Sequence, residues 1–333
     1  MFSLKVIGVM ATGVLLGWIG RNLCRFAFLG KTIFCTVLLL LFWMGVEVGS
    51  NPYITQNIVR LGGQSLLLSA AGTLGSILLA KWVYSRFFSG SLGKRLVEEG
   101  ESAEARRNGS VPETDVRNDS QEGSSWKSTL LTLGAFVLGC FIGYGVSLPE
   151  GFKEWDISLY ILYALMFQVG LNIGSDPKIK ETLRQVRPRL LLVPVATWTG
   201  TLLFCALASF LLVRWSLWDC LAVGSGFAYY SLSSILITEL KSASLGLTAA
   251  TELGVIALMA NILREIITIV GAPFFVKYFG KLAPICAGGA TTMDTTLPAV
   301  TQACGKEWVF VSMFHAVLVD LSVPFLVSFF CSL

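Results

Sequence analysis

The sequence predicts an all-α polytopic membrane protein with about eight transmembrane helices and two oppositely oriented broken-helix segments, built as an inverted repeat. Three observations support this prediction: the composition, the length of the apolar segments and an internal repeat. Apolar residues make up 54% of the 333 residues and charged residues only 14%, and the mean hydropathy is +0.70. Soluble domains carry about 25% charged residues, so this chain is too apolar to be one.

Eight apolar segments have about the 20 residues that a helix needs to cross the hydrocarbon core of a bilayer. They lie near residues 4–20, 32–48, 62–84, 129–148, 157–174, 190–213, 251–276 and 307–332. The first resembles a signal peptide, but it lacks a small-x-small cleavage site and Arg21 follows at once. We therefore expect it to be the first span.

Two further segments, 217–245 and 283–303, are interrupted by glycine, serine, threonine and proline. In lipid, non-helical backbone is tolerated only where it is buried in protein or lines a wet cavity. We therefore expect each segment to enter the membrane as a broken helix and to return, with the two tips meeting at mid-membrane.

Basic residues near span ends are retained in the cytoplasm, which sets the orientation. Basic residues follow the first span, occur throughout 86–127 and are frequent in 178–189. If both broken segments crossed fully, Lys277 and Lys281 would lie outside. If 217–245 enters from the outside and 283–303 from the inside, every basic loop is cytoplasmic and both termini are extracytoplasmic.

An internal repeat supports this topology. The stretch 42–54 aligns without gaps on 167–179, with the phenylalanine, the isoleucine and three helix-end signals shared. Because the first copy ends outside and the second inside, the repeats are inverted, as in many secondary transporters. In the motif, Gly49 or Gly174 can stop a helix and Asn51 or Asp176 can cap the next. A structural turn is the favoured interpretation, and a direct role in substrate binding stays open.

The chain then divides into four parts. Residues 1–85 form the first membrane repeat, and 86–127 form a charged cytoplasmic loop that we expect to be disordered. Residues 128–215 form the second, inverted repeat. Residues 216–333 form a transport core that contains both broken segments.

Six acidic residues lie in or beside the predicted spans. They are Glu47, Glu239, Glu252, Glu265, Asp294 and Asp320. A charge at the bilayer centre costs about 2.5–3.5 kcal/mol on insertion scales, so such groups need partners or a function. Glu47 and Glu252 are close to span ends, where interfacial water can solvate them, and Asp320 can satisfy a neighbouring helix end.

Asn261, Glu265 and Thr268 follow a spacing of three to four residues and so form one polar stripe on the 251–276 helix. Together with the broken segments, this stripe offers what a small zwitterion needs: helix N-termini that attract a carboxylate, and hydroxyls and carbonyls that accept from an ammonium. We expect the substrate-binding residues to be Tyr229, Tyr230, Ser231, Ser233, Glu239, Asn261, Arg264, Thr292 and Asp294. The alternatives are close helix packing for the small residues and a structural ion pair for Arg264 or Glu265.

Several classes of function are disfavoured. The eight cysteines are scattered singly and the chain has one histidine, so neither a metal site nor a disulfide framework is indicated. Hydrolase motifs such as H-E-x-x-H and G-x-S-x-G do not occur, so we expect no enzyme and no cofactor. The basic residues lie beside spans and form no basic face for nucleic acid.

The stretches 226–239 and 286–298, the pair Arg264–Glu265, and His315 within 314–320 resemble the bacterial lysine exporter family of the LysO type. The resemblance is specific over about residues 220–330. It implies an inner-membrane exporter of L-lysine and close analogues such as thialysine, driven by the proton gradient. It also implies that Glu239, Glu265 and Asp294 are the functional acids.

The physics of export agrees with central carboxylates. An acid that holds a proton cannot pair with an ammonium, so proton and lysine exclude each other and antiport follows. Lysine carries a net charge of +1, and moving it outward costs about 2.3 kcal/mol per 100 mV. Using the voltage requires at least two protons, which suggests that Glu265 and Asp294 titrate while Glu239 guides the ammonium. Arg264 or the hairpin N-termini would hold the α-carboxylate.

The expected partners are therefore L-lysine, protons and the lipid bilayer, with no nucleic acid and with a homodimer left open. A sodium-coupled transporter of a small organic anion on a similar scaffold is the alternative, because broken-helix carbonyls also coordinate Na⁺.

Overall fold

The computed structural model describes residues 2–20, 29–50, 52, 56–88, 131, 134–145, 157–175 and 189–333, and within these ranges it is helical without strands. The helices before the broken segments are α1 (Phe2–Gly20), α2 (Leu29–Gly49), α4 (Ile58–Val83, continued by a π-helical turn over Tyr84–Phe88), a helix over 134–145, α8 (Ile157–Ser175) and α10 (Leu192–Ser209). The remaining helices are α11 (Leu217–Gly224), α12 (Tyr230–Leu245), α13 (Leu247–Phe279), α14 (Leu282–Gly288), α15 (Leu297–Cys304) and α16 (Val309–Cys331).

Among the described residues, four helices are long and apolar enough to cross a membrane: Ile58–Phe88, Leu192–Ser209, Leu247–Phe279 and Lys306–Cys331. Shorter apolar helices cover Gly8–Gly20, Lys31–Val46 and Gly134–Gly145. All seven coincide with predicted spans, and the total of eight spans stays a prediction. Most of the 86–127 loop, the basic cluster 178–187, and the turn residues Asn51 and Asp176 lie outside the described residues.

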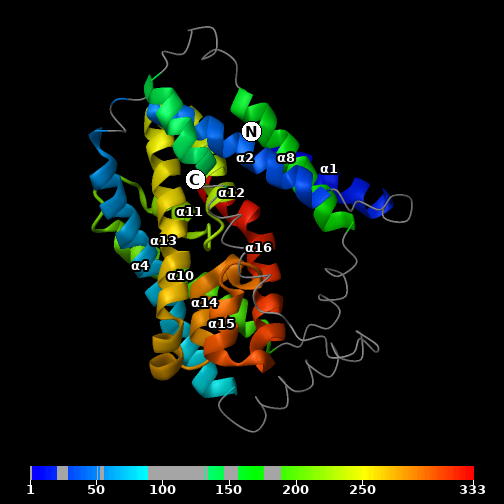
Figure 1. The fold of residues 1–333 in the computed structure, drawn as a ribbon, viewed down its shortest axis with the longest axis vertical. Helices are drawn as coiled ribbons and strands as arrows, with labels where there is room; N and C mark the ends of the chain where they lie inside the picture. Colours follow the sequence, from blue (N-terminus) through cyan, green and yellow to red (C-terminus); the bar gives the residue numbers. More distant parts are fainter. Residues whose placement is uncertain are drawn as a thin grey trace.

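The two broken segments form hairpins that reach the middle of the protein from opposite ends. Figure 1 shows α11 and α12 at one end of the long helix α13, and α14 and α15 at the other. An ion pair joins the two ends of each hairpin: Lys241 Nζ lies 2.9 Å from Asp219 Oδ1, and Lys281 Nζ lies 2.8 Å from Glu307 Oε1. The helices α13 and α16 run in opposite directions past both hairpins (Figure 1).

The hairpin tips meet through a backbone hydrogen bond. The N–H of Ala290 donates to the carbonyl oxygen of Phe227 at 2.9 Å. Phe227 and Ala228 have positive φ angles of 43° and 73°, a backbone conformation that costs non-glycine residues about 1–3 kcal/mol. Gly289 has φ 60°, and a Cβ there would lie 2.3 Å from the Phe227 oxygen, so this contact requires glycine.

Glycines also allow three pairs of helices to approach closely. Gly75 of α4 and Gly200 of α10 face each other, and a Cβ on either would lie 2.1 Å or 2.4 Å from the other's carbonyl oxygen. Helix α1 packs on α8 in the same way through Gly13, Gly17, Gly170 and Gly174. Helix α2 packs on the 134–145 helix through Gly45, Gly49, Gly139 and Gly143.

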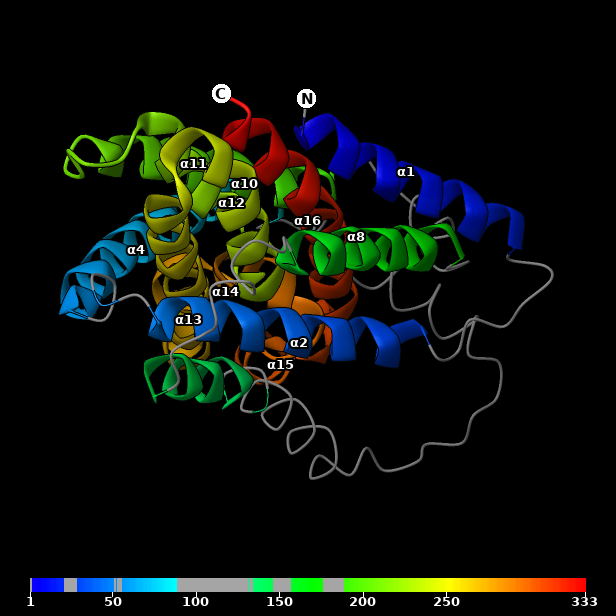
Figure 2. The same ribbon diagram turned by 90° about the horizontal axis from the view of Figure 1, so that it is seen from above.

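Each of these three helix pairs joins a segment that precedes the 86–127 loop to one that follows it. In the α1–α8 pair, Gly13 lies beside Gly170 and Trp18 lies beside Gly174. In the pair of α2 with the 134–145 helix, Gly45 lies beside Gly139 and Ser50 beside Gly143. The residue numbers rise together in each case, so both pairs are parallel. The α4 and α10 helices are antiparallel, because Ala80 near the end of α4 and Val193 at the start of α10 belong to one cluster. Figures 1 and 2 show α1, α2 and α8 lying together as a group against the rest of the protein.

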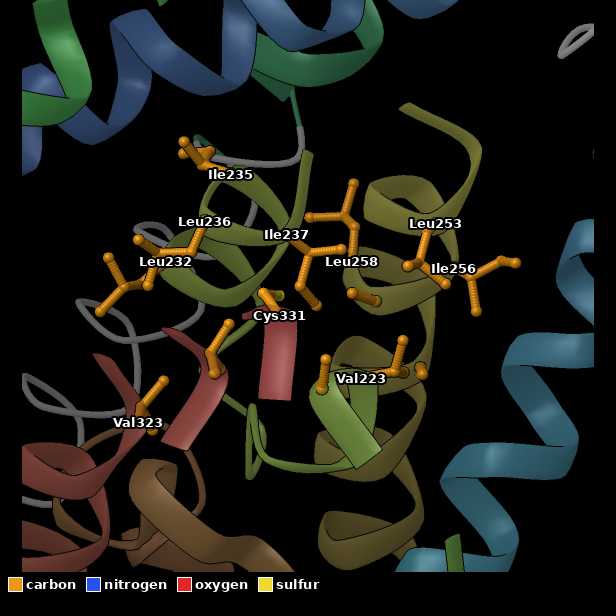
Figure 3. Packing of buried hydrophobic residues seen from close by; sticks show 14 of the residues in the cluster. Val223, Leu232, Ile235, Leu236, Ile237, Leu253, Ile256, Leu258, Val323 and Cys331 are labelled. Carbon is orange, nitrogen blue, oxygen red and sulfur yellow. The ribbon is translucent and has the colours of Figure 1, made fainter. Parts of the chain in front are cut away.

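The largest apolar cluster lies where the first hairpin meets α13 and α16. Figure 3 shows Val223 of α11, Leu236 of α12, Leu253 and Leu258 of α13, and Val323 of α16 packed together. Lipid tails are as apolar as these side chains, so close packing and polar contacts, rather than the hydrophobic effect, must hold the helices together. The polar contacts of the broken segments are therefore central to the stability of the site.

Candidate functional site

A cavity of about 380 Å³ lies where the two hairpin tips meet, within the range of about 300–1,000 Å³ that is usual for ligand pockets. Five parts of the chain form its wall: α2, α8, the two breaks and α16. The lining residues are Ile33, Phe34, Val37, Asn172, Ala228, Tyr229, Tyr230, Ser231, Ala290, Thr291, Met293, Asp294, Thr295 and Asp320.

The lining of this cavity is acidic. Within the described part of the chain it contains two carboxylates, Asp294 and Asp320, and no lysine, arginine or histidine. Hydroxyls of tyrosine, serine and threonine supply the other polar groups. A cavity with this wall attracts cations and repels anions.

Asp294 lies in the second break and is exposed to the cavity. Its Oδ1 accepts a hydrogen bond from the backbone N–H of Thr295 at 2.6 Å. The side chain of Thr295 also lies close to Glu265 on α13. Glu265 is only 5% exposed, and its Oε2 has no hydrogen-bond partner among the residues described. Thr295 therefore links an acid in the cavity wall to a buried acid behind it.

Arg264 lies outside the cavity lining and caps the end of α14. Its Nε donates to the carbonyl oxygen of Ala287 at 2.8 Å, and its Nη2 donates to that of Cys286 at 3.1 Å. Its Nη1 donates to Thr201 Oγ1 at 3.0 Å. The last carbonyls of a helix have no partner within the helix, so this guanidinium satisfies groups that the second break leaves free.

Asn261 serves the first break in a corresponding way. Its Oδ1 accepts from the N–H of Ala228 at 2.8 Å, and its Nδ2 donates to Ser233 Oγ at 3.1 Å. Ser233 Oγ in turn donates to the carbonyl oxygen of Tyr229 at 2.8 Å. Asn261 and Ser233 thus hold the strained backbone of the break rather than line the cavity.

Thr292 joins the second break to α16 and α10. Its Oγ1 lies 3.3 Å from Nδ1 of His315, and Nε2 of the same ring lies 2.8 Å from Thr197 Oγ1. His315 is fully buried. Ser312 Oγ also donates to the carbonyl oxygen of Thr292 at 2.8 Å. Thr292 is therefore fixed by the wall behind the cavity.

Of the nine residues predicted to bind substrate, the structure brings Tyr229, Tyr230, Ser231 and Asp294 together in the cavity lining. Ser233, Asn261, Arg264 and Thr292 lie behind it. Glu239 is half-buried further along α12 and is not among the lining residues. Glu47 belongs to α2, and its side chain lies outside the described residues.

Two acids, Glu252 and Asp320, lie in other surroundings than the sequence predicts. Glu252 was expected at a solvated span end, but its side chain is fully buried and lies 2.7 Å from Arg214 Nη2. Asp320 was expected to satisfy a helix end, but it lines the cavity. Its position in the middle of a long apolar helix was the available signal, because an ionisable group there is by default a candidate for a functional site.

The family model of lysine exporter LysO matches residues 133–331, more than half of the chain. The chain belongs to this family. It is 31% identical over 206 residues to lysine exporter LysO of Escherichia coli strain K12, a match that covers 61% of this chain and 64% of that protein. It is 28% identical over 206 residues to a candidate lysine exporter of Haemophilus influenzae, covering 60% of this chain and 96% of that protein. No solved structure matches the chain.

The family match divides the cavity wall of this LysO-family protein unequally. Both hairpins, Asn172, Asp294 and Asp320 fall within the matched residues. The apolar lining from α2, formed by Ile33, Phe34 and Val37, precedes them. The acidic part of the wall is therefore the part that lies in the region shared with the family.

Proposed function

We propose that this protein is a secondary active exporter of L-lysine and close analogues such as thialysine, located in the bacterial inner membrane. The observation that carries the proposal is the cavity at the meeting point of the two broken helices, whose lining has two carboxylates and, among the described residues, no basic side chain. Membership of the lysine exporter family supports the same substrate. An organic anion, the main alternative substrate, would be repelled by this lining.

Substrate binding follows from the groups in the wall. Asp294 pairs with an ammonium group, and Tyr229, Tyr230 and Ser231 offer hydroxyls to the polar atoms that remain. The first N–H groups of α12 have no side-chain cap, and they lie beside these lining residues. They are the donors for the α-carboxylate, because the Arg264 guanidinium is already engaged by the α14 carbonyls.

Proton coupling uses Asp294 and Glu265. Asp294 meets the substrate directly, while Glu265 is reached through Thr295. Entry of the lysine ammonium favours the ionised form of Asp294, and protonation releases the ammonium. Glu265 supplies the second proton that is needed to draw on the membrane potential. Glu239, outside the lining, guides the cation by its charge.

The arrangement of the hairpins suits alternating access. They enter the protein from opposite ends (Figure 1), and their tips line the cavity. Movement at one tip therefore opens the cavity toward one side only. The three helix pairs that pack through glycines support an inverted repeat. A two-fold rotation that exchanges residues 1–85 with 128–215 replaces α1 by the 134–145 helix and α8 by α2. It therefore converts the α1–α8 pair into the pair between the 134–145 helix and α2. The same rotation maps the α4–α10 pair onto itself.

The test is counterflow of labelled L-lysine in proteoliposomes containing the full chain. We expect uptake into lysine-loaded vesicles, acceleration of net lysine movement by an opposing pH gradient, and no change when sodium is replaced by choline. Vesicles with the double variant Glu265→Gln/Asp294→Asn are the control, and they should lose the pH response. Lysine movement that requires sodium, or a pH response that survives in the double variant, contradicts the proposal.

A further inference from the structure

Asp294 and Asp320 face one cavity from different elements, the second break and α16. We propose that the cavity recognises both ammonium groups of a diamino acid, one with each aspartate, so that Asp320 is a specificity-determining residue. This inference rests on the proposed function and adds the residue that recognises the second ammonium group of the substrate.

The surroundings of Asp320 support a role in binding. It lies in the middle of α16 and is half-buried. In the described part of the chain it has neither a basic partner nor a hydrogen-bond donor, whereas the buried acids Asp219 and Glu252 each have a basic partner within 3 Å. A membrane-embedded carboxylate without a protein partner is costly, so a cationic ligand is the group that completes it.

The two aspartates also share a neighbour in the cavity lining. Tyr229, in the tip of the first hairpin, lines the cavity together with both Asp320 and Asp294. Two carboxylates around one tyrosine repel each other when the cavity is empty. A ligand with one ammonium would leave one carboxylate unpaired, and a ligand with two would neutralise both.

This arrangement predicts how the site rejects wrong substrates. A site whose buried polar groups pair with a group of the substrate discriminates strongly against an analogue without that group, because the buried polar group of the protein is then left unpaired. Amino acids with one ammonium are abundant in cells, so an exporter that accepted them would waste the gradient. The second aspartate gives the protein a means of excluding them.

The experiment measures binding by competition with labelled L-lysine to the full-length purified protein. Two analogues each lack one ammonium: 6-hydroxynorleucine lacks the ε-ammonium, and 6-aminohexanoate lacks the α-ammonium. The variants are Asp320→Asn, Asp320→Glu and, as matched control, Glu307→Gln, which removes an acid from an ion pair outside the cavity.

We expect Asp320→Asn to weaken lysine binding at least tenfold, about the value of one hydrogen-bonded charge. One of the two analogues lacks the ammonium that Asp320 binds. For that analogue, we expect the Kd of Asp320→Asn and the Kd of the unchanged protein to agree within about twofold. Asp320→Glu should retain the preference for lysine over both analogues, and Glu307→Gln should match the unchanged protein.

Equal weakening of lysine and of both analogues by Asp320→Asn would show that Asp320 only supports the fold, and would overturn the inference. Unchanged lysine binding in that variant overturns it as well. If Asp320→Asn does not fold, loss of the lysine preference in Asp320→Glu decides against it. An unchanged protein that binds no lysine refutes the proposed function itself, which is a separate result.

Discussion

At the scale of single residues, the polar groups near the breaks divide into those that face the cavity and those that hold the backbone. Asp294 belongs to the first group, while Arg264, Asn261 and Thr292 belong to the second. The division arises because each break leaves backbone N–H and C=O groups without helical hydrogen-bond partners. In lipid, these groups must be hydrogen-bonded by other parts of the protein. Asn261 satisfies the Ala228 N–H, and Arg264 satisfies two α14 carbonyls.

Replacement of Arg264 by glutamine should therefore affect stability rather than affinity. Two buried carbonyls would lose their donor, at about 1–3 kcal/mol for each unsatisfied group. We expect a lower Tm in thermal unfolding and a lysine Kd within about threefold of the original. Arg189→Gln, at an exposed turn, is the control and should change neither quantity. An unchanged Tm combined with lost lysine binding would contradict this prediction and would indicate that Arg264 binds the α-carboxylate of lysine.

Single variants of the two coupling acids, Asp294 and Glu265, should have different effects, because only Asp294 lines the cavity. Asp294→Asn removes a direct partner of the ammonium, so we expect lysine binding to weaken by at least about tenfold. Glu265→Gln leaves the cavity wall intact and should mainly flatten the pH dependence of lysine efflux. Binding titrations and efflux measured over a pH series check both variants. The scheme fails if Glu265→Gln weakens binding more than Asp294→Asn does.

At the scale of elements, the ion pairs that close the two hairpins differ in environment. Asp219 and Lys241 have side chains only 4% and 8% exposed, whereas those of Glu307 and Lys281 are 41% and 37% exposed. Asp219 also caps α11, since its Oδ2 accepts from the backbone N–H of Ser216 at 3.0 Å. The first hairpin is thus closed by a buried pair and the second by a solvated one.

Breaking each pair should therefore have unequal effects. Asp219→Asn leaves Lys241 buried without its charge partner, which costs about 3–5 kcal/mol. Glu307→Gln breaks an exposed pair worth about 0.2–1 kcal/mol. Thermal unfolding of both variants in the same detergent should show a large fall in Tm for the first and little change for the second. Similar falls in Tm would indicate that burial does not distinguish the hairpins.

Sequence reasoning located the elements better than it assigned their side chains. Apolar length predicted the helices, and the small and polar residues of 217–245 and 283–303 predicted that both segments are broken, because lipid penalises non-helical backbone strongly. The structure places the two breaks at 225–229 and 289–296. Sequence reasoning did not reveal that Arg264 reaches Ala287 and Thr201, since these partners are distant along the chain and their proximity depends on packing. Asp320 was misjudged for the same reason: periodicity on α16 cannot show which neighbour an acid faces.

At the scale of the whole molecule, the helix directions agree with the topology expected from the basic residues. The α13 helix leaves the end where α11 begins, and α16 returns to it, with the ring centroids of Trp218 and Phe330 6.4 Å apart at that end. The end at which α4 finishes is the opposite one, where Phe88 contacts Trp308. Which end faces the cytoplasm stays a prediction, together with the extracytoplasmic placement of both termini.

The helix pairs that join the two halves of the molecule predict that it can be assembled from two fragments. Each of the α1–α8, α2–(134–145) and α4–α10 pairs joins a helix before the 86–127 loop to a helix after it. Contacts between these helices should therefore hold the two halves together without an intact loop. We expect a chain divided within 86–127 to give two fragments that copurify and restore lysine counterflow when expressed together. Gly200→Leu in the second fragment is the decisive control, because its side chain would meet the Gly75 carbonyl oxygen and should abolish copurification. Fragments that fail to associate, or that associate equally well with leucine at 200, would mean that the glycine contacts do not hold the halves together.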